Sequence, residues 1–218
     1  FNIEGNPYAE REGDFPGFMS LIEGTRPHQC TLVPDTPEQL TSDHGWDLTA
    51  ESNRLRPIID QCHCANVRVS LFMDPNEDQI TRAADLEADR IEFYTGPYAE
   101  AWVKSMEKTK SRLAAFKSAS QHAEAAGLAI NAGHDLNREN LAQFCRTLGN
   151  VAEVSIGHAI IADALWYGLA PTVSAYRQIL DGVAAEACWG PSILIEHTFS
   201  RITPRFDYLE PAYPNKHY

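Results

Sequence analysis

The chain of 218 residues is long enough to bury a full hydrophobic core, and a single domain is the default expectation. Apolar residues make up 44% of the sequence and charged residues 22%, which is ordinary for a globular protein. A net charge of −12 argues against nucleic acid or an anionic membrane as the main partner. The net charge does not exclude anionic substrates, because the electrostatic potential of a local site can oppose that of the whole protein.

No apolar run approaches the ~20 residues that a transmembrane helix needs, and the first residues do not show a secretory signal. The five cysteines are odd in number and scattered, which favours a reduced setting over a disulfide framework. We therefore expect a cytoplasmic protein. The tripeptide Cys62-His63-Cys64 has no second ligand pair at zinc spacing, so no metal site is expected.

Short apolar runs alternate with helical patterns along most of the sequence. Six runs predict buried parallel strands: Phe1–Ile3, Gln29–Val33, Val67–Met73, Arg90–Tyr94, Leu128–Asn131 and Val154–Ile156. Such strands are near-continuously apolar because both faces are covered. Helices are predicted at Phe18–Glu23, Ala50–Cys62, Asn76–Glu87, Tyr98–Ala126, Arg138–Leu148, Ala159–Tyr167 and Val173–Ala185. Strand starts recur every ~25 to 40 residues, the spacing of repeated βα units.

Two all-parallel architectures fit this alternation. A doubly wound sheet usually carries a Gly-rich fingerprint after its first strand, and none is present. A TIM (β/α)8 barrel places polar residues at the C-terminal ends of many strands, as this sequence does repeatedly. We therefore expect a barrel over residues 1–187 and a C-terminal tail of unknown role over residues 188–218. The six strands are two fewer than a closed barrel has.

Two glutamates stand out because they lie in or directly after apolar strands. Glu92 lies between Ile91 and Phe93, where a carboxylate is costly unless it is paired or functional. A buried ion pair or an inter-strand hydrogen bond explains it about as well as catalysis does. Glu4 ends its strand, so a solvated loop carboxylate is the plain alternative.

Two glycine–histidine pairs follow the last two predicted strands, and each precedes a helix. Gly133-His134-Asp135 and Gly157-His158-Ala159 resemble two sides of one phosphate site, as is common after the last two strands of barrels. Glycine lets backbone N–H groups approach an anion, and the next helix contributes its positive N-terminus. A histidine there can also donate a proton near neutral pH.

Six segments, in chain order, carry a family resemblance: FNIEGNP, TLVPDTPEQLTSDHGWDL, VSLFMDP, IEFYTGPYA, LAINAGHDLNRENL and EVSIGHAIIADALWYGL. They resemble the pyridoxine 5′-phosphate synthase family over roughly residues 1 to 183. The resemblance implies a TIM barrel, usually assembled as an octamer. It also implies condensation of 1-deoxy-D-xylulose 5-phosphate with 3-amino-2-oxopropyl phosphate to pyridoxine 5′-phosphate, inorganic phosphate and water. No metal or redox cofactor is implied.

The same resemblance implies roles for individual residues. Glu4 corresponds to an acid–base glutamate, Glu92 to a glutamate that stabilises the transition state, and His134 to a proton donor. Four further positions correspond to binding positions for the two phosphorylated substrates or the released phosphate: Thr41, Asp135, Gly157 and His158. Many family members have glycine at position 135, so the Asp135 side chain is expected to point away from the phosphate and to start the next helix.

The sequence also departs from the family. Two earlier βα units of the family, with a histidine base and arginine contacts to phosphate, have no counterpart here, and the family pattern ends near Ala187. A truncated or non-catalytic barrel fragment of the same family therefore remains an alternative. A different phosphate-sugar barrel enzyme is a weaker one, since a Schiff-base aldolase would need a lysine that no predicted strand end supplies.

Overall fold

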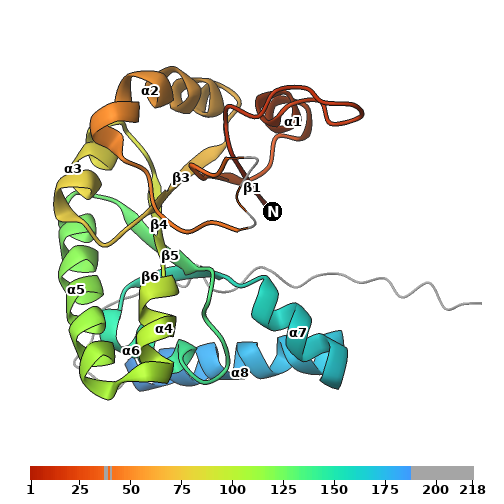
Figure 1. The fold of residues 1–218 in the computed structure, drawn as a ribbon. Coiled ribbons are helices and arrows are strands. Elements are labelled where there is room, and N and C mark those ends of the chain that lie inside the picture. The colour runs from red at the N-terminus through yellow and green to blue at the C-terminus, as the bar shows by residue number, and fades with distance from the viewer. Residues whose placement is uncertain (37–38, 40, 188–218) are drawn as a thin grey trace, which may run out of the picture.

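Six parallel strands form one curled sheet in the computed structural model, which describes residues 1–36, 39 and 41–187 (Figure 1). Each strand pairs with the next along the chain. The strands are β1 (Asn2–Gly5), β2 (Gln29–Leu32), β3 (Arg68–Met73), β4 (Arg90–Tyr94), β5 (Ala129–Gly133) and β6 (Val151–Ser155). This unbroken order makes the fold α/β with sequential βα units, as the alternation of patterns predicted.

Eight helices of the described chain follow the strands, and several of them pack on the outer side of the sheet (Figure 1). They are α1 (Phe18–Thr25), α2 (Leu48–Cys64), α3 (Glu77–Asp85), α4 (Gly96–Lys104), α5 (Met106–Ala125), α6 (Leu141–Leu148), α7 (His158–Tyr167) and α8 (Leu169–Ala187). None of them is long and apolar enough to span a membrane.

The hydrophobic core lies between the outer face of the sheet and these helices. Alternate strand residues point outward, among them Leu71, Ile91 and Ile130, and each is almost fully buried. Aromatic rings extend the core between strand and helix, as where Phe93 meets Phe116 of α5 edge-on at 5.4 Å. Burial on this one face supplies the apolar contacts that hold the units together.

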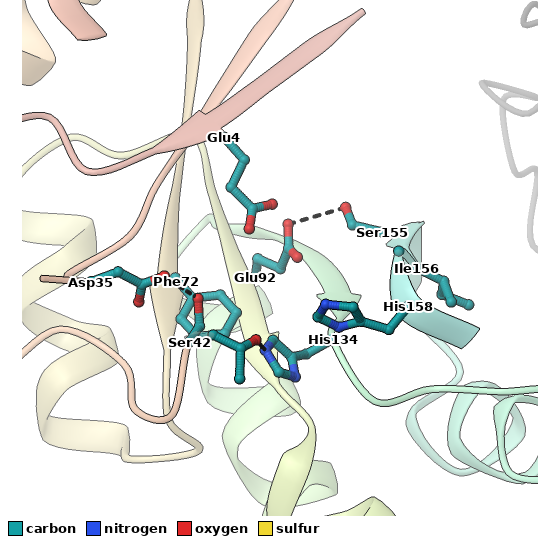
Figure 2. A pocket seen from close by; sticks show the side chains of 11 residues that line it. Glu4, Asp35, Ser42, Phe72, Glu92, His134, Ser155, Ile156 and His158 are labelled. Carbon is teal, nitrogen blue, oxygen red and sulfur yellow. Dashed lines mark hydrogen bonds between the residues drawn. The ribbon is translucent and has the colours of Figure 1, made fainter. Parts of the chain in front are cut away.

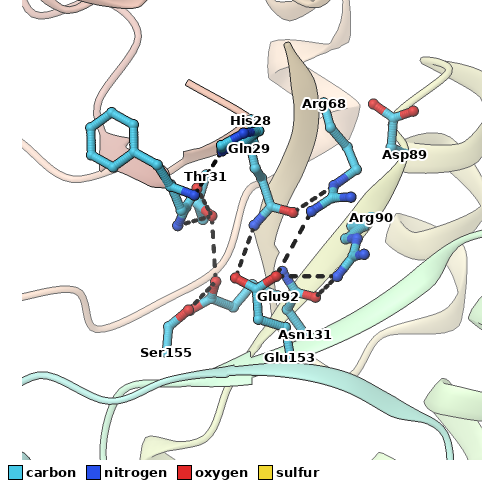
Figure 3. A network of polar contacts seen from close by, with 12 residues as sticks. His28, Gln29, Thr31, Arg68, Asp89, Arg90, Glu92, Asn131, Glu153 and Ser155 are labelled. Atoms are coloured by element: carbon cyan, nitrogen blue, oxygen red, sulfur yellow. Dashed lines mark hydrogen bonds and ion pairs between the residues drawn. The ribbon is translucent and has the colours of Figure 1, made fainter. Parts of the chain in front are cut away.

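The inner, concave face of the sheet is polar, contrary to the expectation of strands that are apolar on both faces. Figure 3 shows its hydrogen-bonded network. Arg68 Nε donates to Gln29 Oε1 at 2.8 Å, and Arg90 donates to Asn131 Oδ1 at 2.8 Å and to Glu153 Oε2 at 3.3 Å. These partners on other strands lower the cost of burying the polar groups, because a buried donor or acceptor is costly only when it is left unpaired. Arg90 Nε and Asn131 Nδ2 have no hydrogen-bond partner among the described residues.

One predicted helix is wrong as a single element. The pattern over residues 98–126 predicts one long helix, but the chain breaks between α4 and α5 at Ser105. Ser105 is extended, with φ −164° and ψ 124°, and its side chain accepts a hydrogen bond from the Lys108 backbone N–H at 3.4 Å. Serine is a favoured N-cap because its oxygen satisfies a backbone donor of the first turn.

Several other boundaries differ from their predictions, and two of these differences have a clear physical reason. Strand β6 begins at Val151 and not at Val154, since Glu153 is part of the strand and pairs with Arg90 on the inner face. The helix expected from Arg138 begins at Leu141. Asn137 explains the delay: its side chain accepts from the backbone N–H groups of Glu139 and Asn140 and holds a turn ahead of the helix.

The sheet has two open sides in the described part of the chain. Among these residues no strand pairs with the outer edge of β1 or of β6, so the closed eight-unit barrel is not seen. Beside β6, helix α7 exposes several large apolar side chains, including Leu165 and Trp166. The predicted tail, residues 188–218, lies outside the described residues.

Candidate active site

A cavity of about 450 Å³ opens at the C-terminal ends of the strands (Figure 2). It is lined by Glu4, Asp35, Thr41, Ser42, Phe72, Glu92, His134, Ser155, Ile156, Gly157 and His158. These residues come from several strands and from the loop after β2, which are far apart in the sequence. The lining contains every predicted site residue except Asp135.

Glu92 is the buried carboxylic acid at the base of the cavity, with 1% of its surface exposed. Two hydroxyl groups donate to its Oε2, Ser155 Oγ at 3.2 Å and Thr31 Oγ1 at 3.4 Å. Burial, followed by the nearby charge of Glu4, raises the pKa of Glu92 to about 8, and the two hydrogen bonds oppose that rise only in part. The group therefore exchanges a proton near neutral pH.

Gly133 explains how a strand backbone can approach this carboxylate so closely. A Cβ at position 133 would lie 2.6 Å from the carbonyl oxygen of Ser155 and closer still to Glu92 Oε1. Real Cβ atoms do not approach other atoms to this distance, so only glycine leaves the space that Glu92 occupies. Gly133, directly before His134, therefore leaves room for the side chain of Glu92 on the neighbouring strand.

Glu4 extends from β1 toward Glu92 across the mouth of the cavity (Figure 2). Its pKa is raised by partial burial first and by the charge of Asp35 second, while His134 acts in the opposite direction. Two carboxylic acids that face one another resist simultaneous ionisation, because the second negative charge must form beside the first. The pair can therefore hold and release a proton between them.

His134 directly follows β5 and has a left-handed backbone, with φ 73°. This conformation is uncommon for residues other than glycine and is enriched at functional positions. Thr41 Oγ1 lies at hydrogen-bonding distance from His134 Nε2, 2.8 Å, and the Tyr94 ring packs edge-on against the imidazole at 5.3 Å. These contacts fix the ring at the cavity wall.

Gly157 and His158 form the opposite side of the cavity, at the start of α7. Gly157 is the N-cap residue and provides no side-chain cap, so the first backbone N–H groups of α7 have no acceptor within the helix. A Cβ at Gly157 would meet nothing within 4 Å. The His158 ring lies 6.2 Å from the His134 ring, centroid to centroid. An open helix N-terminus of this kind suits an anion.

Residues 1–182 match the model of a protein family described as pyridoxal phosphate biosynthesis protein PdxJ. The chain belongs to this family. The PdxJ relatives include the pyridoxine 5′-phosphate synthase of Xanthomonas campestris pv. campestris (strain B100), 51% identical over 187 residues, which are 86% of this chain and 72% of the relative. The synthase of Xanthomonas axonopodis pv. citri (strain 306) is 52% identical over 180 residues, 83% and 70% of the two chains. That of Xylella fastidiosa (strain 9a5c) is 49% identical, with 84% and 70% covered.

Asp135 is the predicted site residue of this PdxJ chain that does not line the cavity. Its side chain is 45% exposed, and Oδ2 lies 3.2 Å from His134 Nδ1 without the alignment of a hydrogen bond. Its backbone carbonyl accepts from Asn140 Nδ2 at 3.3 Å. The expectation that Asp135 starts the next helix is wrong, because α6 follows Asn140 as its N-cap.

Five lining residues of this PdxJ cavity were not among the predicted site residues: Asp35, Ser42, Phe72, Ser155 and Ile156. Ser155 holds Glu92 through its hydroxyl group, and Phe72 packs 6.2 Å from the His134 ring. Ser155 lies two residues after Glu153 in β6, so its inward direction follows once the strand's true start is known. Asp35 gave a weaker signal, since it follows β2 in a loop whose path depends on distant contacts.

Proposed function

We propose that the chain is a pyridoxine 5′-phosphate synthase that condenses 1-deoxy-D-xylulose 5-phosphate with 3-amino-2-oxopropyl phosphate. One observation carries the proposal: Glu4, Glu92 and His134 converge on a single cavity beside an open helix N-terminus. Membership of the PdxJ family supports it, as do relatives that bear this name. The products are pyridoxine 5′-phosphate, inorganic phosphate and water.

Ring formation from these substrates consists mainly of proton transfers. The amine of one substrate attacks a carbonyl carbon of the other, water leaves to give an imine, phosphate is eliminated, and an aldol-type closure with loss of water completes the ring. Glu4 exchanges protons as acid and base, since its raised pKa lets it hold one. His134 donates a proton to a leaving group, and Glu92 stabilises charge that develops at the base of the cavity.

The start of α7 is proposed as the phosphate site. The backbone N–H groups at Gly157 and His158 donate to phosphate oxygens, and the helix dipole favours the negative charge. Thr41 contacts the deoxyxylulose phosphate from the loop after β2. Position 135 contributes through its backbone, because the Asp135 side chain is directed away from the cavity lining.

We also propose that the curled sheet is part of a (β/α)8 barrel formed by residues 1–187, with residues 188–218 as a separate tail. The sequential strand order and the polar residues at the strand ends support a barrel. The proposal extends to an oligomeric, octameric assembly in the cytoplasm, which rests on the family resemblance alone.

The activity is tested by incubating the purified chain with both phosphorylated substrates and measuring pyridoxine 5′-phosphate. Product that is lost in His134→Asn supports the proposal, since asparagine tolerates the left-handed backbone at that position and removes only the imidazole. The second candidate is a non-catalytic member that binds phosphate, which the unpaired outer edges of β1 and β6 in the described chain favour. Absence of product together with retained phosphate binding would select this second candidate.

The phosphate site is tested separately with Gly157→Val. The valine side chain would occupy the open space at the start of α7, so we expect the affinity for inorganic phosphate, measured by titration calorimetry, to fall at least tenfold. Gly182→Val is the matched control, because Gly182 lies in α8, where an added Cβ would meet nothing within 4 Å, and takes no part in the cavity. Equal phosphate affinity in the two variants would place the phosphate elsewhere.

A further inference from the structure

Asp35 lies in the loop after β2 and lines the cavity with a carboxylate that has no role in the proton transfers proposed for Glu4, Glu92 and His134 (Figure 2). Its Oδ2 accepts a hydrogen bond from Ser42 Oγ at 2.5 Å. Its Oδ1 is buried and has no hydrogen-bond partner among the described residues. Burying a carboxylate oxygen without a hydrogen-bond donor costs free energy, and a ligand that donates to this atom would remove that cost.

The charges around the cavity restrict what that donor can be. Within the described chain, no lysine or arginine lines the cavity. Asp35 and Glu4 lie toward one side, and His158, the first residue of α7, lies on the other (Figure 2). One side of the cavity therefore favours a cationic group and the other an anionic group.

We propose that Asp35 binds the amino group of the amine-bearing phosphate substrate and thereby selects and orients it. The inference rests on the proposed function and assigns the amine end of that substrate to a residue. An ammonium group donates to Oδ1 of Asp35, while its phosphate lies at the start of α7. With both ends held, the molecule has one orientation in the cavity.

Glu4 completes the step that follows binding. An ammonium nitrogen has no free electron pair, so it must lose a proton before it attacks a carbonyl carbon. The proton passes from the nitrogen to the Glu4 carboxylate, and the neutral amine keeps the electron pair. The Asp35 carboxylate holds the nitrogen in place throughout.

The alternative role for Asp35 is structural: its hydrogen bonds with Ser42 and Asn6 would hold the loop after β2 in place. The two roles are separable, because Asn6 Nδ2 donates to the backbone carbonyl of Asp35, which any substitution keeps. Asp35→Asn preserves shape and removes the charge. Ser42→Ala removes the hydroxyl tie and leaves the charge of Asp35 intact.

The test compares two probes by calorimetry, 2-aminoethyl phosphate and ethyl phosphate, which differ in the amine. We expect the unaltered chain to bind the amine-bearing probe at least tenfold more tightly, Asp35→Asn to lose this preference, and Ser42→Ala to keep it. Affinity for inorganic phosphate should be the same in all three chains.

Equal preference in Asp35→Asn and the unaltered chain would overturn the assignment, as would a lack of preference in the unaltered chain. Loss of the preference in Ser42→Ala alone would also overturn it, in favour of the loop tie. A kinetic measurement separates this inference from the proposed function. Where product forms, Asp35→Asn should raise KM for 3-amino-2-oxopropyl phosphate by about 10- to 100-fold and leave KM for the deoxyxylulose phosphate within about twofold. A clear probe preference without any product would contradict the synthase activity and leave the amine site standing.

Discussion

Replacing Glu92 with glutamine is expected to make the chain more stable above neutral pH than it is with glutamate. The folded chain raises the pKa of Glu92 to about 8 from an ordinary value of 4.5, mainly through burial. Between these two values the folded state binds more protons than the unfolded state. The contribution of Glu92 to the free energy of unfolding is therefore fully present below pH 4.5 and is lost as the pH rises through 8.

The size of the effect follows from the pKa difference. Each pH unit in that window changes the free energy of unfolding by up to about 1.4 kcal/mol for one group, so the whole window is worth several kcal/mol. Glu92→Gln removes this dependence because glutamine does not ionise. A smaller slope of the same sign remains from Glu4, whose pKa is also raised.

Urea unfolding at a series of pH values from 5 to 8.5 measures the effect. The matched control is Glu107→Gln, an exposed glutamate in the first turn of α5, which should retain the slope of the unaltered chain. Identical slopes in Glu92→Gln and the unaltered chain would show that Glu92 is ionised in the folded state throughout. Turnover in the Glu92 variant should fall by about 100-fold or more, since glutamine cannot exchange a proton at the base of the cavity.

Gly133→Ala should destabilise the chain by about 1–3 kcal/mol, which is the usual cost of overpacking a filled space. The added methyl group would meet the backbone carbonyl of Ser155 at 2.6 Å and the Glu92 carboxylate. The backbone contact cannot be relieved by a side-chain rotation, so β5 and β6 must shift. Urea unfolding and titration of Glu92 by NMR both report the change.

Gly157→Ala is the matched control, because the same chemical change at the glycine that lines the cavity meets nothing within 4 Å. It should leave the free energy of unfolding within about 0.5 kcal/mol of the unaltered value. A double variant, Gly133→Ala with Glu92→Ala, should lose less than the sum of the two single changes, because one of the two clashes is gone. Full additivity would show that the methyl group and the carboxylate do not compete for space.

Much of the architecture could be predicted, because strand and helix periodicities are local properties of the sequence. The order of the units, the position of Glu92 within a strand and that of His134 at a strand end followed from them. The break at Ser105 could not be read from periodicity, since a capping serine and a serine within a helix look alike in a continuous helical pattern.

The site residues also divide into those that the sequence could predict and those that only the folded structure reveals. Glu4, Thr41 and Gly157 were found through motifs that are contiguous in the chain, and the structure places them in the cavity lining. The reason for Gly133 is a contact with neighbouring strands, and the importance of Asp35 lies in a missing partner. Neither property exists until the chain is folded, so no local pattern could reveal them.

Because the inner face is polar and the outer face apolar, each strand contributes both to the cavity and to the hydrophobic core. In β4, Ile91 and Phe93 face the helices, while Arg90 and Glu92 face the concave side. Substitutions at alternate positions can therefore reshape the reaction chamber without emptying the core, so selection for a new substrate and selection for folding act on separate sets of residues. The same arrangement makes a change of pairing register strongly destabilising. A slip of one residue would place charged groups against the helices and aliphatic groups in the chamber.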